Sequence, residues 1–423
     1  MRPSTVPEVA DAVAAAHRAH WGSVLAATVG LTRDLDLAED AVQDAFVQAL
    51  TAWRSGGIPA SPGGWLATAA RRRALDALRR GETLHRKLPL LVWDEGAPEP
   101  APGEEGQHAP PRIADEERAV VLDEQLRLIF LAAHPALAPE ARIALTLRLV
   151  GGLSTAQIAA AFLVSESTMA ARLTRAKKRI VLSRIPCRVP AEDEIDARLI
   201  DVLDVVSVLL ATGERDADGD VLRAASRILE LLAALRPAHT ETQGLLAQAM
   251  LLRSRTATRR DRHGRPVALA QQDRAAWDRE LVERADALVL DALARGARGP
   301  YLLQGAIAAA VAAPARHEDV DWEEVVALYD ALLAHWPTAI VRLGRIVALG
   351  EAHGPGEALA QLDGLGEELA EHRPFHVIRG EMLSRLGEHE AATKALRTAL
   401  DRRGDEGETD LLRGMLRGGR PLR

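Results

Sequence analysis

Basic side chains gather at two places in the sequence, and their density suits them to holding phosphate groups. From Glu166 to Arg179 there are five basic residues and one acidic residue, and from Arg71 to Lys87 there are seven basic and two acidic residues. Clustered cations bind nucleic acid by releasing the counterions condensed on its backbone. The alternative interpretation of each segment is an ordinary helix with a charged face in water. The pairing of two such segments on one chain favours nucleic-acid binding.

Catalytic and metal-binding patterns are not found in the sequence. The histidines are scattered and show no His-Glu-x-x-His spacing, and there is no Gly-x-x-x-x-Gly-Lys-Ser/Thr phosphate loop. The acidic group Asp319, Asp321, Glu323 and Glu324 stands at an expected helix start, where carboxylates favour the helix dipole. The single cysteine, Cys187, excludes an internal disulfide. We therefore expect a protein that is not an enzyme and needs no metal or cofactor.

The composition predicts an all-α chain. Aromatic residues make up only 3% of the 423 residues, whereas alanine, leucine and arginine, which favour helices, dominate. The net charge of −7 argues at first against nucleic acid, but it averages over segments of opposite sign. The most apolar stretch, residues 301–315, is shorter than the roughly 18 residues of a membrane span. We expect no targeting segment, no membrane partner and a cytoplasmic location.

The segment from residue 153 to residue 182 predicts a helix-turn-helix. Ser154 and Gln157 have the spacing of a capping box, and Ser165 is placed to cap a second helix. One face of that second helix should be buried through Met169, Leu173, Ala176 and Ile180. Its basic residues then project elsewhere, in a form suited to a major groove.

Two helices are expected near the N-terminus. Residues 37–53 carry an apolar stripe that includes Phe46, and the polar side chains Asp40, Gln43 and Asp44 lie off that stripe. A basic helix follows over residues 64–80. Trp65, at its start, has two interpretations, packing in the core or contact with nucleic acid, because a lone Trp is usually buried.

A proline-rich acidic segment separates these parts. Residues 94–118 hold eight acidic and two basic residues, and prolines interrupt regular structure. An extended linker of about 25–30 residues reaches up to ~90 Å, enough to span two helical turns of DNA at ~34 Å each.

Beyond residue 190 the sequence indicates a helical repeat. Glu324, Glu357 and Glu390 each begin a similar helix at a spacing of 33 residues, and an apolar helix precedes each. Residues 224–235 and 240–253 suggest an earlier, degenerate pair. This period is typical of tetratricopeptide-like repeats.

The combined motifs resemble bacterial RNA polymerase sigma factors of the extracytoplasmic function group. Residues 37–46 together with 65–80 resemble their domain 2, and residues 153–169 resemble the helix-turn-helix of domain 4. Residues 134–153, 272–278, 299–304 and 321–330 resemble the subgroup with a C-terminal tetratricopeptide-like extension. The resemblance implies domain 2 over residues 1–88, a linker over 89–115, domain 4 over 116–188 and the extension over 189–423.

The resemblance also implies partners and roles. Core RNA polymerase would be bound through its β′ clamp helices and β flap, with Asp40, Gln43 and Asp44 on the clamp helices. Phe46 lies in the same segment but belongs to the buried stripe. The −10 promoter element would meet Trp65, Arg71, Arg72, Asp76, Arg79 and Arg80. The −35 element would meet Ser165, Glu166, Ser167, Thr168, Arg172, Arg175, Lys178 and Arg179.

Two questions stay open at the level of sequence. Ala170 and Ala171 stand where relatives often carry polar residues, so this helix is expected to depend on phosphates and DNA shape. The repeats could bind a protein partner, or pack on the sigma domains and gate them. The alternative function is a helix-turn-helix regulator with a helical-repeat sensor and no sigma activity.

Overall fold

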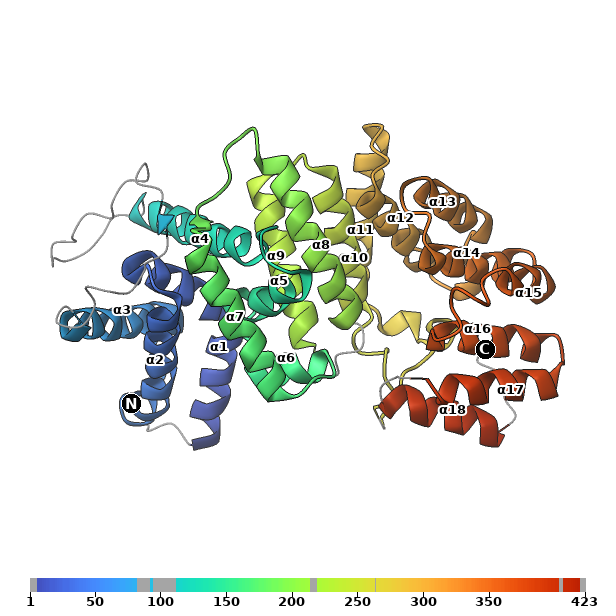
Figure 1. Ribbon diagram of the computed structural model, residues 1–423, viewed down its shortest axis with the longest axis horizontal. Helices are drawn as coiled ribbons and strands as arrows, with labels where there is room; N and C mark the ends of the chain where they lie inside the picture. The colour runs from blue at the N-terminus through green and yellow to red at the C-terminus, as the bar shows by residue number, and fades with distance from the viewer. Residues whose placement is uncertain are drawn as a thin grey trace. The chain divides into compact units, whose positions relative to one another are not determined.

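The computed structural model describes residues 6–81, 92–93, 112–213, 219–262, 264–402 and 406–418, and helices dominate this part of the chain. Its one sheet is a pair of parallel two-residue strands, β1 (Val92–Trp93) and β2 (Pro186–Cys187). The all-α prediction is therefore confirmed. The chain divides into two compact units, residues 1–235 and 236–423, whose helices are labelled in Figure 1.

Three helices open the first unit: α1 (Val6–Thr32), α2 (Leu35–Gly56) and α3 (Pro62–Gly81). The Oδ1 atom of Asp34 accepts hydrogen bonds from the backbone N–H groups of Asp36 and Leu37, which fixes the start of α2. Most of the predicted apolar stripe of α2 is buried, with Phe46 7% exposed and Trp53 1% exposed, but Leu50 of the same stripe is 40% exposed. The predicted helices over residues 37–53 and 64–80 are thus confirmed.

The middle of the first unit is built from shorter helices. These are α4 (Arg112–Ala132), α5 (Pro139–Leu145), a π-turn over Thr146–Val150, α6 (Thr155–Ala161) and α7 (Glu166–Leu182). Their shared core is apolar. It contains the buried side chains of Phe130, Leu145, Leu147, Ile158 and Met169. The acidic linker predicted over residues 89–115 lies outside the described residues, apart from β1 and the first turn of α4.

A helical hairpin completes the first unit. It consists of α8 (Ile195–Gly213) and α9 (Asp220–Leu235). The Arg198 guanidinium of α8 donates to the carbonyl oxygen of Phe130 in α4 at 3.0 Å, and α8 also packs against α5. Both helices lie in the compact unit that also holds α1 to α7, and the assignment of residues 189–423 to one extension stays a prediction. The division between the units falls at residues 235 and 236.

The second unit is a series of helices, with a long connection over residues 255–278 between the first two. It begins with α10 (Thr240–Ser254), α11 (Arg279–Ala294) and α12 (Pro300–Ala312), with two 3₁₀ turns at Leu269–Gln271 and Arg274–Ala276. A third 3₁₀ turn, His317–Asp319, leads into α13 (Trp322–His335), α14 (Ala339–Ala352) and α15 (Pro355–Asp363). The unit ends with α16 (Arg373–Arg385), α17 (His389–Leu400) and α18 (Glu406–Gly418).

The predicted repeat corresponds to helix pairs in this unit. Helices α13, α15 and α17 begin within three residues of Glu324, Glu357 and Glu390. Each packs against the helix before it, in the pairs α12 with α13, α14 with α15 and α16 with α17. Asp321 caps α13 by accepting from the N–H of Glu324 at 3.0 Å, as its position suggested. The earlier pair is formed as two helices, α9 and α10, but the division between the units falls between them.

Candidate nucleic-acid interface

The helix-turn-helix is fixed by side-chain caps at both of its helices. The Oγ of Ser154 accepts from the N–H of Gln157 at 3.1 Å, and the amide oxygen of Gln157 accepts from the N–H of Ser154 at 2.9 Å. Ser165 accepts from the N–H of Thr168 at 3.2 Å at the start of α7. Leu163, with φ of 52°, makes the turn between the helices. The two predicted caps are therefore confirmed, and they set where α7 begins.

Helix α7 divides cleanly into a buried and an exposed face. Met169, Leu173, Ala176 and Ile180 are all less than 9% exposed, as their spacing predicted. Arg172 is half-buried. The other residues predicted to meet the −35 element are exposed: Ser165, Glu166, Ser167, Thr168, Arg175, Lys178 and Arg179. The hydroxyl groups of Ser167 and Thr168 lie 3.1 Å and 2.7 Å from the Oγ of Ser165, so both are partly engaged in the cap.

Helix α3 carries the second basic face. Arg71, Arg72, Asp76, Arg79 and Arg80 are all exposed, while Leu66, Ala70 and Ala74 on the opposite side are fully buried. A cavity of about 650 Å³ opens beside this face and is lined by Trp65, Thr68, Arg72, Arg73 and Asp76. Arginines beside a cavity of this kind can hold phosphate groups or an unstacked base.

Trp65 lies at the edge of the core and at the edge of this cavity. Its ring is half-buried and meets that of Trp53 edge-on, with centroids 5.7 Å apart and planes at 72°. Such pairs are favourable because the positive ring edge meets the negative ring face. Of the two interpretations of Trp65, packing is the one with a visible partner in the structure.

The exposed face of α2 is acidic. Asp40, Gln43 and Asp44 all point away from the core, and Val47, 65% exposed, continues the same stripe. Burial, followed by the negative charges of Asp36 and Glu39, raises the pKa of Asp40 above its ordinary value. This face offers carboxylates and one apolar contact to a partner.

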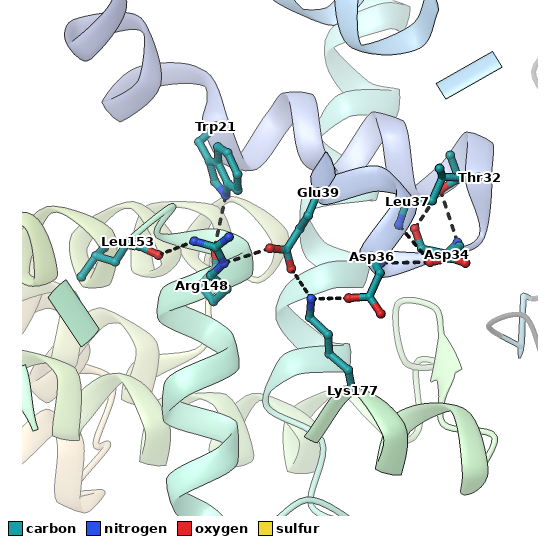
Figure 2. Close-up of polar contacts among 9 residues, drawn as sticks. All are labelled: Trp21, Thr32, Asp34, Asp36, Leu37, Glu39, Arg148, Leu153 and Lys177. Atoms are coloured by element: carbon teal, nitrogen blue, oxygen red, sulfur yellow. Dashed lines mark hydrogen bonds and ion pairs between the residues drawn. The ribbon is translucent and has the colours of Figure 1, made fainter. Parts of the chain in front are cut away.

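Four further residues connect α2 to α7 and to the turn before α6 through ion pairs. The sequence patterns did not predict these contacts. Lys177 of α7 meets Asp36 and Glu39 of α2 at 2.6 Å and 2.9 Å, and Arg148 meets the other oxygen of Glu39 at 2.9 Å (Figure 2). We refer to Asp36, Glu39, Arg148 and Lys177 as the charge cluster. One signal was available in the sequence, because Glu39 falls four residues after Leu35 and three before Val42, on the apolar face of α2.

Neither a metal-binding cluster nor a membrane-spanning helix is found in the described part of the chain. No group of three or more His, Cys, Asp or Glu residues there is arranged to hold a metal ion. Among the described helices, none combines the length and apolar character that crossing a membrane requires.

Comparison with known proteins assigns families to three segments. Residues 17–83 match the family Sigma-70 region 2, and residues 127–180 match Sigma-70 region 4. Residues 198–293 match a family of unknown function, DUF6596. The two sigma segments coincide with α1 to α3 and with α4 to α7, so each matched region carries one of the basic helices described above.

Two relatives resemble the chain over different shares of its length. An uncharacterized protein of Rhizobium meliloti is 38% identical over 380 residues, which cover 88% of this chain and 86% of that protein. A probable ECF RNA polymerase sigma factor, SigI, of Mycobacterium tuberculosis is 30% identical over 190 residues, or 44% of this chain and 61% of SigI. No solved structure matches the chain.

The fold and the basic helices define a DNA-binding protein built from sigma region 2 and sigma region 4. The chain contains Sigma-70 regions 2 and 4, is similar over 44% of its length to a probable sigma factor of the extracytoplasmic function group, and carries a C-terminal helical extension. Core RNA polymerase and promoter DNA are the partners of this class, and the matched sigma families are not families of enzymes.

Proposed function

We propose that the protein directs core RNA polymerase to specific promoters by reading two DNA elements with two basic helices. The observation that carries this proposal is helix α7, whose capped start and exposed basic face form one complete helix-turn-helix. In the proposal, Glu166, Ser167 and Thr168 meet base edges of the −35 element, and Arg172, Arg175, Lys178 and Arg179 hold its phosphates. With Ala170 and Ala171 exposed beside them, DNA shape contributes much of the specificity.

Helix α3 takes the −10 element in this proposal. Arg71, Arg72, Arg79 and Arg80 hold the backbone, and the cavity beside Trp65 and Asp76 receives a base that has left the stack. Because aromatic residues make up only 3% of the chain, strand separation depends mainly on arginines and on the polymerase.

The acidic face of α2 docks on the polymerase. Asp40, Gln43 and Asp44 contact the clamp helices of the β′ subunit, and region 4 contacts the β flap. The exposed positions of these three side chains support this assignment. The second unit regulates the sigma regions, through a protein partner or through a contact within the chain, and the protein acts in the cytoplasm.

Run-off transcription with purified core polymerase and a genomic promoter library tests this function. We expect promoter-specific transcripts with the full chain, and few or none with an Arg175→Ala/Lys178→Ala variant. A matched control, Lys394→Ala, removes an exposed lysine of α17 and is expected to keep full activity. A chain that binds promoter duplexes but yields no specific transcript across the library is a regulator without sigma activity, and the proposal fails.

A further inference from the structure

The charge cluster joins region 2 to region 4 across a large distance in sequence. Glu39 and Lys177 are separated by 138 positions, and Glu39 and Arg148 by 109. The Nζ of Lys177 lies between the carboxylates of Asp36 and Glu39, while the Arg148 guanidinium takes the second oxygen of Glu39 (Figure 2). One buried carboxylate therefore holds two cations of region 4 at once.

The centre of the cluster is withdrawn from water. The Glu39 side chain is 5% exposed, Arg148 15% and Lys177 19%, whereas Asp36 is 76% exposed. Removing one partner of a buried pair is costly because the remaining charge is left uncompensated. Burial by itself lowers the pKa of Lys177, but the neighbouring carboxylates of Glu39 and Asp36 raise it more. The pKa is therefore raised overall, and this amine stays charged.

Contacts around Trp21 extend the same junction. The indole N–H of Trp21 in α1 donates to the carbonyl oxygen of Arg148 at 3.2 Å, and the Arg148 guanidinium lies 5.8 Å from the ring centroid. Gly152, with φ of +72°, lets the chain pass against this ring, since a Cβ there would lie 2.7 Å from Cγ of Trp21. Region 4 thus rests on α1 as well as on α2.

Helix α9 contacts both sides of this junction. The guanidinium of Arg227 donates to the carbonyl oxygen of Ala19 in α1. The side-chain amide of Gln157 in α6 donates to Asp220 of α9 at 3.0 Å. Helix α9, which follows region 4 in the chain, therefore contacts both region 2 and region 4 and helps to hold them together.

This arrangement conflicts with simultaneous reading of two promoter elements. If α3 and α7 bind elements about two helical turns apart, at ~34 Å a turn, then α2 and α7 cannot remain in contact through side chains. Lys177 also belongs to the basic residues of α7. In the cluster it pairs with Asp36 and Glu39 of region 2, so it is not available to a phosphate group. We propose that the charge cluster latches the protein in a closed state that must open before polymerase and promoter bind productively. This proposal rests on the promoter-reading function proposed above.

The latch has a defined energetic role. Opening breaks two ion pairs at Glu39 and exposes Trp21, which is 3% exposed in the closed state. A ligand shifts such an equilibrium only by its difference in affinity for the two states. Polymerase binding to α2 would supply that difference, because Asp36 and Glu39 lie on the same helix as the exposed acidic residues Asp40, Gln43 and Asp44.

Distance measurement on the full-length protein tests the latch without requiring transcription. Spin labels on Ser55→Cys in α2 and Ser183→Cys after α7 report the separation of the two regions, since both serines are exposed. Native Cys187 is buried, which raises the pKa of its thiol to about 12 and slows its reaction with the label. Pulsed electron paramagnetic resonance then gives the distance distribution in the free protein.

Three variants on α2 make the test specific. Glu39→Gln and Asp36→Asn each remove a carboxylate from Lys177, and Asp44→Asn removes one from the exposed face of the same helix. We expect wild type and Asp44→Asn to give one short, narrow distribution. Glu39→Gln should raise the ratio of open to closed protein about tenfold, which corresponds to ~1.4 kcal/mol. Asp36→Asn, at an exposed position, should act in the same direction with less risk to folding.

The outcomes separate the latch from the function. An open-to-closed ratio that stays at the wild-type value in both Glu39→Gln and Asp36→Asn overturns the latch, as does a wild type without a short distribution. An equal response of Asp44→Asn also overturns it, because the effect would then come from the general charge of α2. Run-off transcription by wild type is unaffected by any of these results, so failure of the latch leaves the promoter-reading proposal standing.

Discussion

Trp65 meets Trp53 edge-on, with ring centroids 5.7 Å apart and an angle of 72° between the rings. Trp53 is 1% exposed, so the pair links the start of α3 to the core of region 2. This contact assigns Trp65 a packing role whatever it does toward DNA. The basic face of α3 is held in place in part by this pair.

Replacing Trp65 should therefore reduce stability before it changes recognition. We expect Trp65→Ala to lower the free energy of unfolding by about 2 kcal/mol, and Trp65→Phe to recover most of that loss through a retained ring contact. Chemical denaturation followed by circular dichroism measures both. An unchanged midpoint for Trp65→Ala, together with weaker promoter binding, would contradict the packing role.

Helices α10 and α12 cross closely at Gly244, and a methyl group there would collide with the backbone of Leu302. We expect Gly244→Ala to destabilise the second unit by about 2 kcal/mol, since neither backbone can give way. Gly414→Ala in α18 is the matched control, because its added methyl group meets open space and improves helix propensity. Thermal unfolding should shift in opposite directions for the two variants, and equal shifts would show that the crossing is not tightly packed.

The carboxyl group of Glu124 in α4 lies over Gly30 of α1, and burial is the main cause that raises its pKa to about 7. Unfolding returns the pKa to its ordinary value of 4.5, so the folded chain binds more protons than the unfolded chain between these pH values. The free energy of unfolding should therefore fall as pH rises from about 4.5 to about 7, by on the order of 3 kcal/mol.

Denaturation midpoints at pH 5 and pH 8 check this pH dependence. Glu124→Gln should be more stable than wild type at pH 8. The difference between its free energies of unfolding at pH 5 and pH 8 should be much smaller than in wild type. Glu140→Gln, at an exposed position of α5, should keep the wild-type difference. If Glu124→Gln keeps it as well, Glu124 is not the group responsible.

Arg175 and Lys178 of α7 should contribute mainly phosphate contacts. Because each contact releases about one condensed counterion, we expect each alanine variant to reduce the slope of log affinity against log salt by about 0.9. Fluorescence anisotropy with a promoter duplex between 50 and 200 mM salt gives the slope. Lys394→Ala should leave it unchanged. A loss confined to one DNA sequence would instead indicate base contacts by these side chains.

The packing of α8 predicts where the chain can be shortened. Truncation after Pro190 removes α8 and uncovers the surfaces of α4 and α5 on which it packs, including its contact from Arg198 to Phe130. Truncation after Leu235 keeps the whole first unit. We expect the longer fragment to be soluble and to unfold cooperatively, and the shorter one to aggregate or unfold at lower temperature. Equal stability of the two would show that α8 is dispensable for the first unit.

Most of what the sequence determined is local. The caps at Ser154 and Ser165, the buried stripe of α7 and the helices of the repeat depend on interactions between residues a few positions apart. Spacing alone is therefore enough to predict them. The same local patterns, with the charge of each segment, pointed to two basic helices on one chain.

The tertiary structure alone decided which of these helices meet. Glu39 lies on the apolar stripe of α2, yet nothing in its neighbourhood along the chain indicates that Arg148 and Lys177 are its partners. The sequence patterns also do not show that α8 and α9 share a compact unit with α1 to α7. Both results depend on contacts between residues more than 60 positions apart. Such contacts depend on which buried surfaces pack together in space. Periodicity along the chain predicts which face of a helix is buried, but not which distant element covers that face.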